Sequence, residues 1–539
     1  MFEEILASQQ AGYPILTVLT FLPILAAFIV WRLSDERIIK TIGLGTTLGV
    51  FLLSLQLYLS FVPGTSAIQF GENISWITPL GIKYHLGVDG ISVFFVILTA
   101  LLSFLILLYS LDEVNDKLRT YVLCILSLEG IVIGIFSSLD LVLFFFFWEI
   151  MLIPSYFLIK VWGSGQKEYA ALKYIIYNLA GSVLMLVGIA ILFLNYHDYA
   201  LVQELDSTYS TDLLQMLAVP LDLNKQIWIF VLFFFGFAVK TPIVPFHTWL
   251  PDALSSGPIA ASVVLAGIKL GTYGFLRFSL LLAPEASRMF VPMMMALGLI
   301  GILYGSIIAL MQSDLKRMMA YSSIGHLGFV TVGLFALNYR GLQGSLIHML
   351  NLGIITAGLF FIIGFLMNRG LPTEIKRLGG LARPLPVLAT ITLILALASI
   401  GLPGTNGFIG EFLILLGAFE AYWIYAAIGV LGIILGAAYM LWMYEQAFFG
   451  KSALGGAEEK SKGLKDFNLR EWVVGAVLVI LIFWIGLYPA PFLEVINPSI
   501  EGLVQRLEQG TPSLVVEHEQ RPLKAIERNL TTVKVEERP

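Results

Sequence analysis

The chain has 539 residues, of which 58% are hydrophobic and 13% are charged, and its mean hydropathy is +0.86. Soluble domains carry about 25% charged residues, so this composition excludes a soluble globular protein and indicates one that crosses a membrane many times. The net charge of -5 and the lack of a basic, aromatic-rich patch exclude nucleic acid as a partner.

Apolar runs of sufficient length predict fourteen transmembrane helices, and therefore an all-α polytopic membrane protein. The tenth span is the least regular, because polar residues interrupt its start. The spans are expected near residues 14–31, 41–62, 89–110, 120–137, 140–160, 170–194, 226–250, 257–282, 289–312, 320–337, 342–368, 385–418, 421–448 and 471–489.

The basic residues predict the orientation of these helices. Loops after odd-numbered spans hold nineteen lysines and arginines, whereas loops after even-numbered spans hold four. Basic loops stay in the cytoplasm, so both termini are expected on the non-cytoplasmic side. The acidic N-terminal segment lacks the basic region of a cleavable signal, so the first span is expected to remain. The host membrane is expected to be a bacterial inner membrane or a cyanobacterial thylakoid.

Spans 4–8 and 9–13 predict two units of five helices, and an odd number of helices forces the second unit to be inverted. The seventh span breaks at Lys240–Pro242 and the twelfth at Gly401–Gly407, which are corresponding positions, although chance could also supply this match. The expected divisions are three N-terminal helices, two repeats, a last helix and a polar tail: residues 1–119, 120–282, 283–450, 451–498 and 499–539.

Lys240 follows a long apolar run and is bracketed by Gly236, Pro242 and Pro245, which break the helix near its ammonium group. A lone lysine at mid-bilayer costs about 2.5–3.5 kcal/mol, so it is expected to have a partner. Glu149, near the middle of the fifth span, is the natural candidate. A buried pair whose separation changes would release a proton; the alternative is a static pair that only joins two helices.

Lys269 lies midway along the eighth span between Gly267 and Gly271 and is a candidate proton relay. Arg277, two turns later, is expected to balance a carboxylate or reach the interface, and a structural role is favoured. His247 either continues the path from Lys240 or caps the break in the seventh span.

His326 and His348 fall in neighbouring spans, and imidazole suits proton relay near neutral pH. A hydrogen-bonded core role is the alternative for each. Glu411 follows the break in the twelfth span, where it is placed to exchange protons with one aqueous side. No metal is expected at the histidines, because no third histidine, cysteine or close carboxylate comes at ligand spacing.

The remaining polar features carry less information. Glu129 is a deep carboxylate with no evident partner, while Asp89 and Glu445 lie near span ends and are expected to face solvent or lipid headgroups. Cys124, the one cysteine, excludes an iron–sulfur or cysteine-based zinc site made by this chain alone. No nucleotide-binding or hydrolase motif is present, so the chain is expected to bind no cofactor and to hold no energy source.

Four stretches in order carry a family resemblance: FWEIMLIPSYFLI, AVKTPIVPFHTWLPDA, SDLKRMMAYSSIGHLGFV and LASIGLPGTNGFIGEFLILLGAF. Over residues 85–490 the chain resembles the antiporter-like membrane subunit M of complex I, which has counterparts in the mitochondrial, cyanobacterial and plastid enzymes. The resemblance implies fourteen helices with inverted repeats. It also implies an ion pair at Glu149 and Lys240, a central relay lysine at Lys269, a tenth-span histidine at His326 and a terminal carboxylate at Glu411.

Two departures from the family pattern stand out. The family usually has an N-H-G element in the eleventh span, where this chain reads Asn351-Leu352-Gly353 and His348 comes one turn earlier. The family commonly has histidine where Leu254 stands, and the eighth span here is two residues shorter. That shortening would rotate Lys269 by about 200° unless a bulge compensates.

The resemblance implies a proton-translocating, non-redox subunit of an NAD(P)H or ferredoxin:quinone oxidoreductase. Quinone, flavin and iron–sulfur clusters would then belong to other subunits, and the expected partners are other membrane-arm subunits, including further antiporter-like ones, and lipid. One alternative is a subunit of a multisubunit sodium/proton antiporter. Another is a structural scaffold in which the buried charges only join helices.

Overall fold

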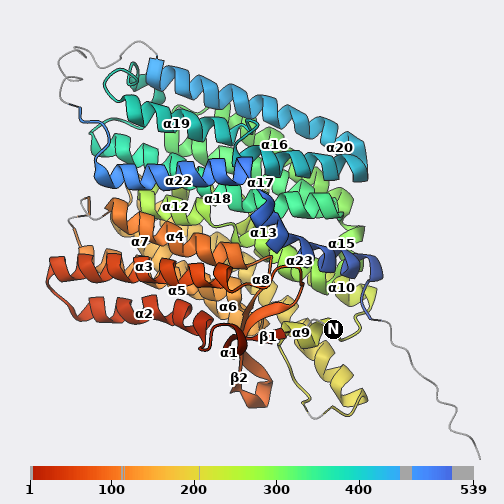
Figure 1. The fold of residues 1–539 in the computed structure, drawn as a ribbon. Coiled ribbons are helices and arrows are strands. Elements are labelled where there is room, and N and C mark those ends of the chain that lie inside the picture. The colour runs from red at the N-terminus through yellow and green to blue at the C-terminus, as the bar shows by residue number, and fades with distance from the viewer. Residues whose placement is uncertain (1–3, 111–112, 115, 206, 450–463, 513–539) are drawn as a thin grey trace, which may run out of the picture.

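The structure is a computed structural model that describes residues 4–110, 113–114, 116–205, 207–449 and 464–512. It is a bundle of long apolar helices that run side by side (Figure 1). Thirteen helical segments of the described chain are long and apolar enough to cross a membrane. The all-α polytopic fold class is therefore confirmed.

The chain begins with a short strand and helix, two long helices and a β-hairpin. These elements are β1 (Glu4–Leu6), α1 (Ala7–Gln10), α2 (Ile15–Arg32), α3 (Glu36–Leu59), β2 (Ile68–Ile77), η1 (Thr78–Leu80) and β3 (Ile82–Val88). Strand β2 pairs in parallel with β1 and antiparallel with β3. The sequence analysis did not predict this small sheet, because it lies between two spans where hydropathy carries no signal.

The next part of the chain corresponds to predicted spans three to eight. It comprises α4 (Val93–Ser110), α5 (Leu118–Ser137), α6 (Leu141–Ile150), α7 (Leu152–Trp162), α8 (Lys167–Val202), α9 (Leu213–Leu217), α10 (Leu223–Lys240), α11 (Trp249–Ser256), α12 (Ile259–Gly267), α13 (Leu270–Gly274), the π-helical turn η2 (Phe275–Ser279) and α14 (Leu280–Leu282). Short helix α9 lies in the connection between α8 and α10. The break between α10 and α11 confirms the predicted interruption of the seventh span.

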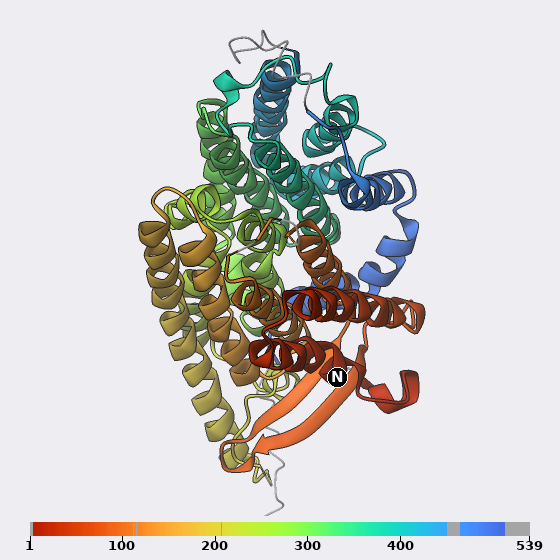
Figure 2. The ribbon, with the colours of Figure 1, turned by 90° about the vertical axis from the view of Figure 1, so that its left-hand side faces the viewer.

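The second half begins after α14. It comprises α15 (Pro284–Met289), α16 (Val291–Leu310), α17 (Leu315–Phe335), α18 (Tyr339–Asn368), η3 (Ile375–Arg377), α19 (Pro386–Ser399), α20 (Asn406–Tyr444), the π-helical turn η4 (Glu445–Phe449), α22 (Leu469–Leu487) and α23 (Ala490–Gln509). The gap between α19 and α20 confirms the predicted break in the twelfth span. Figure 2 shows this half at one edge of the bundle and the N-terminal helices with the hairpin at the other.

Helix α20 contains two of the predicted spans joined at a kink. Tyr422 has a non-helical backbone there (φ -152°, ψ 87°), close to the predicted boundary between spans twelve and thirteen. A Cβ added at Gly429 would come within 3.1 Å of the Leu415 side chain, so the two halves pack against each other as a hairpin. Dividing α20 at this kink raises the thirteen candidate segments of the described chain to the fourteen predicted crossings, and α19 with the first half of α20 forms the broken twelfth span.

The C-terminal helix α23 departs from the polar tail expected from residue 499 onward. It is amphipathic and buries Phe492, Ile496, Ile500, Leu503 and Leu507 against the bundle. Its two prolines are tolerated because one is in the first turn and the helix is held by packing. The tail beyond residue 512 lies outside the described residues. The described ends of the chain, β1 and α23, lie at the same end of the bundle (Figure 1), as an even number of crossings requires.

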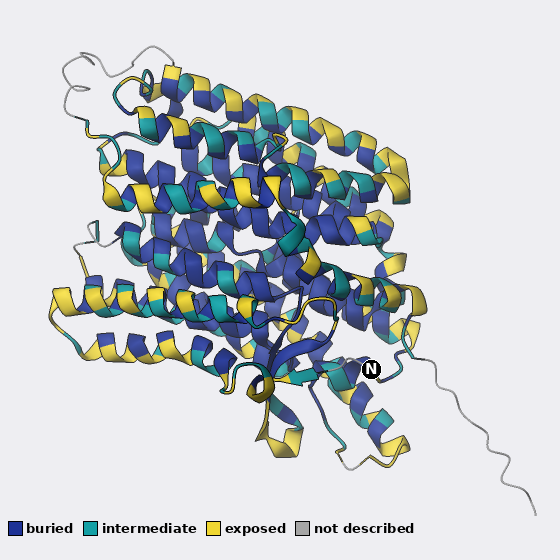
Figure 3. Ribbon diagram, in the orientation of Figure 1, coloured by how far each residue is buried: buried dark blue, intermediate teal, exposed yellow. Residues whose placement is uncertain are grey.

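Burial separates the central helices from peripheral helices with exposed outer faces (Figure 3). Every residue in the most apolar stretch of α18 is buried, whereas only 28% of the residues in the corresponding stretch of α3 are buried. Exposed apolar side chains lie along α2, α3, α8 and the second half of α20. The buried polar residues are concentrated on the central helices.

Polar caps fix where several helices begin. The side chains of Asp35, Asp140, Asp222, Asp314 and Asn338 each accept hydrogen bonds from backbone N–H groups in the first turn of the following helix. These caps satisfy donors that have no partner within the helix. The capped helices α3 and α17 accordingly begin at Glu36 and Leu315, five residues before the starts that apolar length predicted.

A buried histidine anchors the β-hairpin to the bundle. His85 on β3 is 1% exposed, and its Nδ1 and Nε2 lie 2.8 Å from Asp212 Oδ2 and 3.1 Å from Glu4 Oε1. Lys83 Nζ also lies 3.4 Å from Asp212 Oδ2. This cluster joins β1, β3 and α9 outside the membrane-spanning segments.

We predict that this anchor weakens at high pH. Burial alone would lower the pKa of His85, but its bonds to Asp212 and Glu4 outweigh burial and raise that pKa from 6.5 to about 9. A raised folded-state pKa means that the stabilisation, on the order of 3 kcal/mol, is complete below pH 6.5 and is lost as pH rises through about 9. Hydrogen exchange of residues 68–88 in His85→Asn and in wild type checks this: the difference is expected to be large at pH 6 and small at pH 10.

His197→Asn is a suitable control, because His197 hydrogen-bonds the Thr208 carbonyl rather than a carboxylate. A difference between His85→Asn and wild type that is as large at pH 10 as at pH 6 would contradict the prediction.

Candidate functional site

Lys240 is the last residue of α10, and the chain after it stays non-helical as far as Trp249. Proline at positions 242 and 245 removes backbone donors, which explains why the helix ends inside the apolar layer. The Lys240 ammonium lies 3.4 Å from the Tyr174 hydroxyl and over the rings of Trp148 and Tyr174 at 5.7 and 5.3 Å. Cation–π contacts therefore surround a lysine that the sequence placed at mid-membrane.

Glu149 lies on α6, next to Trp148, and interacts electrostatically with Lys240. No ion pair within 4.0 Å joins the two side chains, both of which the structure describes. Buried Oε1 of Glu149 has no hydrogen-bond partner in the described part of the chain. The direct ion pair expected from the sequence is thus replaced by a separated pair, because aromatic rings and a tyrosine hydroxyl solvate the lysine.

Lys269 lies at a break in the eighth span, between α12 and α13, with φ -93° and ψ 60°. It is 4% exposed, and its ammonium donates a hydrogen bond to the carbonyl of Ala266. The shorter span was expected to rotate Lys269 by about 200° unless a bulge compensates, and the structure shows irregular backbone of that kind. A break precedes α13 and a π-helical turn follows it, so the shorter span is accommodated by irregular backbone.

Helix α13 packs closely against the end of α10. A Cβ at Gly271 would come within 2.4 Å of the Thr241 backbone nitrogen, and one at Gly274 would meet the Phe237 ring at the same distance. The absence of side chains at these glycines lets the two helices approach. The segments that carry Lys240 and Lys269 are therefore neighbours.

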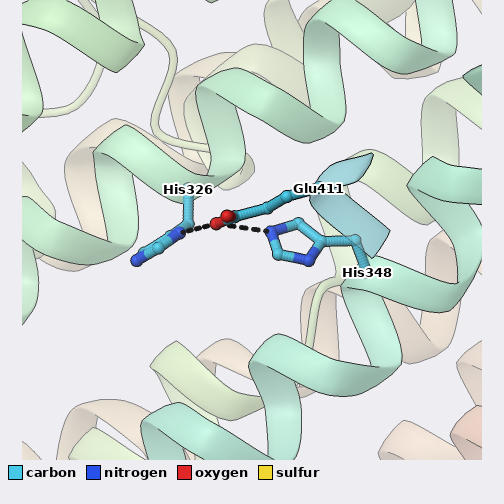
Figure 4. Close-up of side chains that lie close together, drawn as sticks. All are labelled: His326, His348 and Glu411. Carbon is cyan, nitrogen blue, oxygen red and sulfur yellow. Dashed lines mark hydrogen bonds and ion pairs between the residues drawn. The ribbon is translucent and has the colours of Figure 1, made fainter. Parts of the chain in front are cut away.

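Three predicted residues from three helices converge in one buried cluster, shown in Figure 4. His326 on α17 and His348 on α18 face Glu411 on α20, and all three are at most 8% exposed. His326 Nδ1 lies 3.1 Å from Glu411 Oε1, and His348 Nε2 lies 3.8 Å from the same oxygen. The Ser399 hydroxyl, at the end of α19, is 3.3 Å from the other nitrogen of His326.

The sequence predicted no metal at the histidines on the ground that no carboxylate comes close to them, and that ground is wrong. A carboxylate does lie close to both histidines, and one donor atom from each of the three residues falls within 4.8 Å of the others. The sequence hid this because Glu411 is far from either histidine along the chain. Two imidazoles and a carboxylate are a common zinc donor set, and here one ring hydrogen-bonds Glu411 Oε1 while the other lies 3.8 Å from the same oxygen.

The helix that carries His348 also approaches the segment just before Lys269. The close approach of α12 and α18 depends on small residues, since a Cβ at Gly353 would lie 2.9 Å from the Gly267 carbonyl. Asn351 donates to the Asn406 carbonyl at 2.6 Å, and Leu352 is buried. His348, one turn before the family's usual histidine position, is thus the residue that reaches the cluster.

The remaining candidates lie apart from this cluster. Glu129 on α5 is fully buried, and its carboxylate oxygens have no hydrogen-bond partner among described residues. His247, in the break before α11, packs its ring against Tyr304 and Tyr321. Leu254, where the family has histidine, is buried.

Arg277 balances a carboxylate and does not reach the interface, which confirms the first of the two roles that the sequence predicted. Its partner is Asp89, which is 4% exposed, so the expectation that Asp89 faces solvent or headgroups is wrong. Asp89 precedes α4 and is covered by α23, an element the sequence analysis did not identify. Glu445 is exposed, as expected.

The sequence analysis missed a polar cluster around α11. Asp252 on α11 pairs with Lys173 at 2.7 Å and with Arg317 at 3.4 Å. Buried Lys316 donates to the carbonyls of Ser255 and Gly257 at 3.2 and 2.7 Å, at the C-terminal end of α11. These contacts fix α11 to α8 and α17. The L-P-D-A and S-D-L-K-R stretches, both noted in the sequence, were the available signal.

Buried ionisable residues in a helical bundle with broken helices are typical of ion-translocating membrane proteins. Residues 138–436 match the family described as "NADH:quinone oxidoreductase/Mrp antiporter, TM". NADH-ubiquinone oxidoreductase chain 4 of Marchantia polymorpha is 40% identical over 92% of this chain and 97% of its own length. NADH-quinone oxidoreductase subunit M of Rickettsia prowazekii is 39% identical over 91% and 99%.

Solved structures agree with these relatives. A chain of respiratory complex I from Thermus thermophilus superimposes with a TM-score of 0.82 at 30% identity, covering 91% of this chain and 99% of that one. The Mrp complex from Dietzia sp. gives 0.78 at 21% identity over 92% and 99%, which shows a shared fold. The chain belongs to the family of antiporter-like membrane subunits that includes complex I subunit M.

We predict that Gly410→Ala disturbs the cluster. A Cβ at Gly410, on α20 next to Glu411, would lie 2.5 Å from the His348 Cβ, so α18 and α20 must separate. Overpacking of this kind costs about 1–3 kcal/mol. Heat-induced loss of the subunit from the purified complex is expected at a lower temperature than in wild type.

Gly436→Ala, on the same helix, is the matched control, because its added Cβ would meet nothing within 4 Å. Equal thermal transitions for the two variants would show that the α18–α20 contact is not close-packed at Gly410.

Proposed function

We propose that this chain is a proton-translocating subunit in the membrane arm of an NADH or ferredoxin:quinone oxidoreductase. The observation that carries the proposal is that buried ionisable side chains follow one another across the bundle. Lys240 and Lys269 lie on neighbouring segments, the segment just before Lys269 approaches the His348 helix at Gly267 and Gly353, and His348 and His326 face Glu411. Each group accepts or donates a proton, and together they offer a hopping route through an apolar layer.

In this proposal a proton enters from the cytoplasm near Asp252 and reaches Lys240. A further increase in the distance between Glu149 and Lys240 favours release of the proton, because an isolated ammonium is destabilised by burial. The proton then passes through Lys269 to the histidines and leaves from Glu411 on the far side. The disturbance that separates the pair comes from a neighbouring subunit, since no nucleotide motif lies in the chain.

The chain itself takes no part in electron transfer in this proposal. It has one cysteine, which is buried, and offers no cysteine set for an iron–sulfur cluster. Flavin, iron–sulfur clusters and quinone belong to other subunits, and the partners of this chain are further membrane-arm subunits and lipid. The host is a bacterial inner membrane or a cyanobacterial thylakoid, with both termini on the non-cytoplasmic side.

A sodium/proton antiporter subunit is the second candidate, favoured by the shared fold with the Mrp complex. Sequence identity favours the quinone oxidoreductase subunit, because the matched complex I chain is 30% identical to this chain and the matched Mrp chain is 21% identical. Sodium-dependent transport without a quinone enzyme would favour the antiporter.

We predict that Lys240→Ala abolishes pumping through this subunit while the complex still assembles. The substitution removes the protonatable group at the break, and the surrounding aromatic rings remain. Proton uptake by vesicles that contain the purified complex, measured per quinone reduced, is the readout. Unchanged pumping in the assembled complex would reject the proposal.

The scaffold alternative makes the opposite prediction for a double substitution. If Glu149 and Lys240 only join helices, replacing both with neutral residues leaves proton transport intact. We expect Glu149→Gln with Lys240→Met to lower pumping as far as Lys240→Ala does. The same vesicle assay separates the two readings.

A further inference from the structure

The eighth span is irregular at two places that lie close together along the chain. It breaks at Lys269, continues as the five-residue helix α13, and then widens into the π-helical turn η2, which contains Arg277. Pi-helical turns are rare and persist where other contacts hold them. The contacts that hold η2 therefore bear on the position of Lys269.

Arg277 makes the strongest of these contacts. Its Nη1 and Nη2 donate to Asp89 Oδ2 at 2.8 Å and Asp89 Oδ1 at 2.5 Å, and the two side chains are 3% and 6% exposed. This is a two-pronged pair that only a guanidinium makes, and burial strengthens it. Its Nε donates to the Tyr273 hydroxyl at 3.3 Å, and that hydroxyl donates to the Phe136 carbonyl at 3.1 Å.

Asp89 is itself fixed by the backbone around it. Its Oδ1 accepts hydrogen bonds from the N–H groups of Ile91 and Ser92 at 3.0 and 3.2 Å. The next residue, Gly90, donates to the Ser499 hydroxyl of α23 at 3.0 Å. The carboxylate is thus a rigid anchor at the start of α4, and it is not one of the groups on the proposed proton route.

The register of the eighth span depends on this anchor. A π-helical turn contains one residue more than the α-helical turn that would replace it. If the turn became α-helical, the helix before it would rotate by about 100° relative to the helix after it. Helix α13 is short, and its own packing rests on Gly271 and Gly274 against α10. Loss of the anchor would allow the turn to relax and move the break that carries Lys269.

We propose that Asp89 is a positioning residue: its ion pair with Arg277 holds the π-helical turn, and so holds the backbone break that carries Lys269. The proposal rests on the proposed function, because it assigns that position a role in proton transfer. Neither Asp89 nor Arg277 carries the proton. The Asp89–Arg277 pair sets the position from which Lys269 transfers the proton.

The test uses the whole complex in vesicles. Lys269→Cys in a Cys124→Ser background places a thiol at the break, and its alkylation by N-ethylmaleimide reports its surroundings. Adding Asp89→Asn is expected to change the alkylation rate at least fivefold. In the native Lys269 background, Asp89→Asn is expected to lower protons pumped per quinone reduced at least twofold.

Arg277→Lys is the second variant, and it decides the outcome where Asp89→Asn fails to assemble. It keeps the charge but loses the two-pronged contact, so positioning predicts the same change in alkylation. Glu420→Gln is the matched control, because Glu420 pairs with Arg340 at the exposed surface, and it is expected to change neither readout.

Unchanged alkylation in an assembled Asp89→Asn or Arg277→Lys complex would overturn the positioning role. Normal pumping by Lys269→Cys alone would instead overturn the proposed function at that residue. The two failures are therefore distinguishable, because one is measured on the thiol and the other on proton transfer.

Discussion

The constraint on which this structure depends is that a charge inside the hydrocarbon layer must be compensated by the protein. An uncompensated lysine or arginine at mid-membrane costs several kcal/mol. The structure compensates its buried cations in different ways. Arg277 has a carboxylate, Lys240 has aromatic faces and a hydroxyl, and Lys269 and Lys316 have backbone carbonyls.

These forms of compensation differ in how readily the charge is given up. A two-pronged ion pair fixes a cation, whereas a ring face or a carbonyl accommodates a neutral amine as well. The broken helices supply the second kind, because unwound backbone leaves carbonyls without helical partners. The breaks at Lys240 and Lys269 are thus part of the chemistry, and the intact pair at Asp89 belongs to the framework.

The helices and the breaks at Lys240 and Gly401 were predictable from the sequence, because apolar length and helix-breaking residues act locally. The candidate cluster was predictable residue by residue but not as a cluster. Glu411 is 85 positions from His326, and only packing brings them together. Asp89 and the hairpin were missed for the same reason, since their burial depends on α23 and on contacts with distant segments. The break at Lys269 carried no proline to signal it.

Glu411 offers one oxygen to two imidazole rings, at 3.1 and 3.8 Å. The shorter separation is a hydrogen bond and the longer one is not, so the carboxylate has one partner at a time. Exchange of partners requires a shift of roughly 0.7 Å, close to the thermal displacement of about 0.5 Å per axis in ordered protein. Gly401, which has a positive φ, lies in the turn just before this helix, and a Cβ there would come within 2.6 Å of Glu411 Oε2. The carboxylate therefore has one hydrogen-bonded imidazole, a second imidazole just beyond hydrogen-bond distance, and a glycine turn close behind its other oxygen.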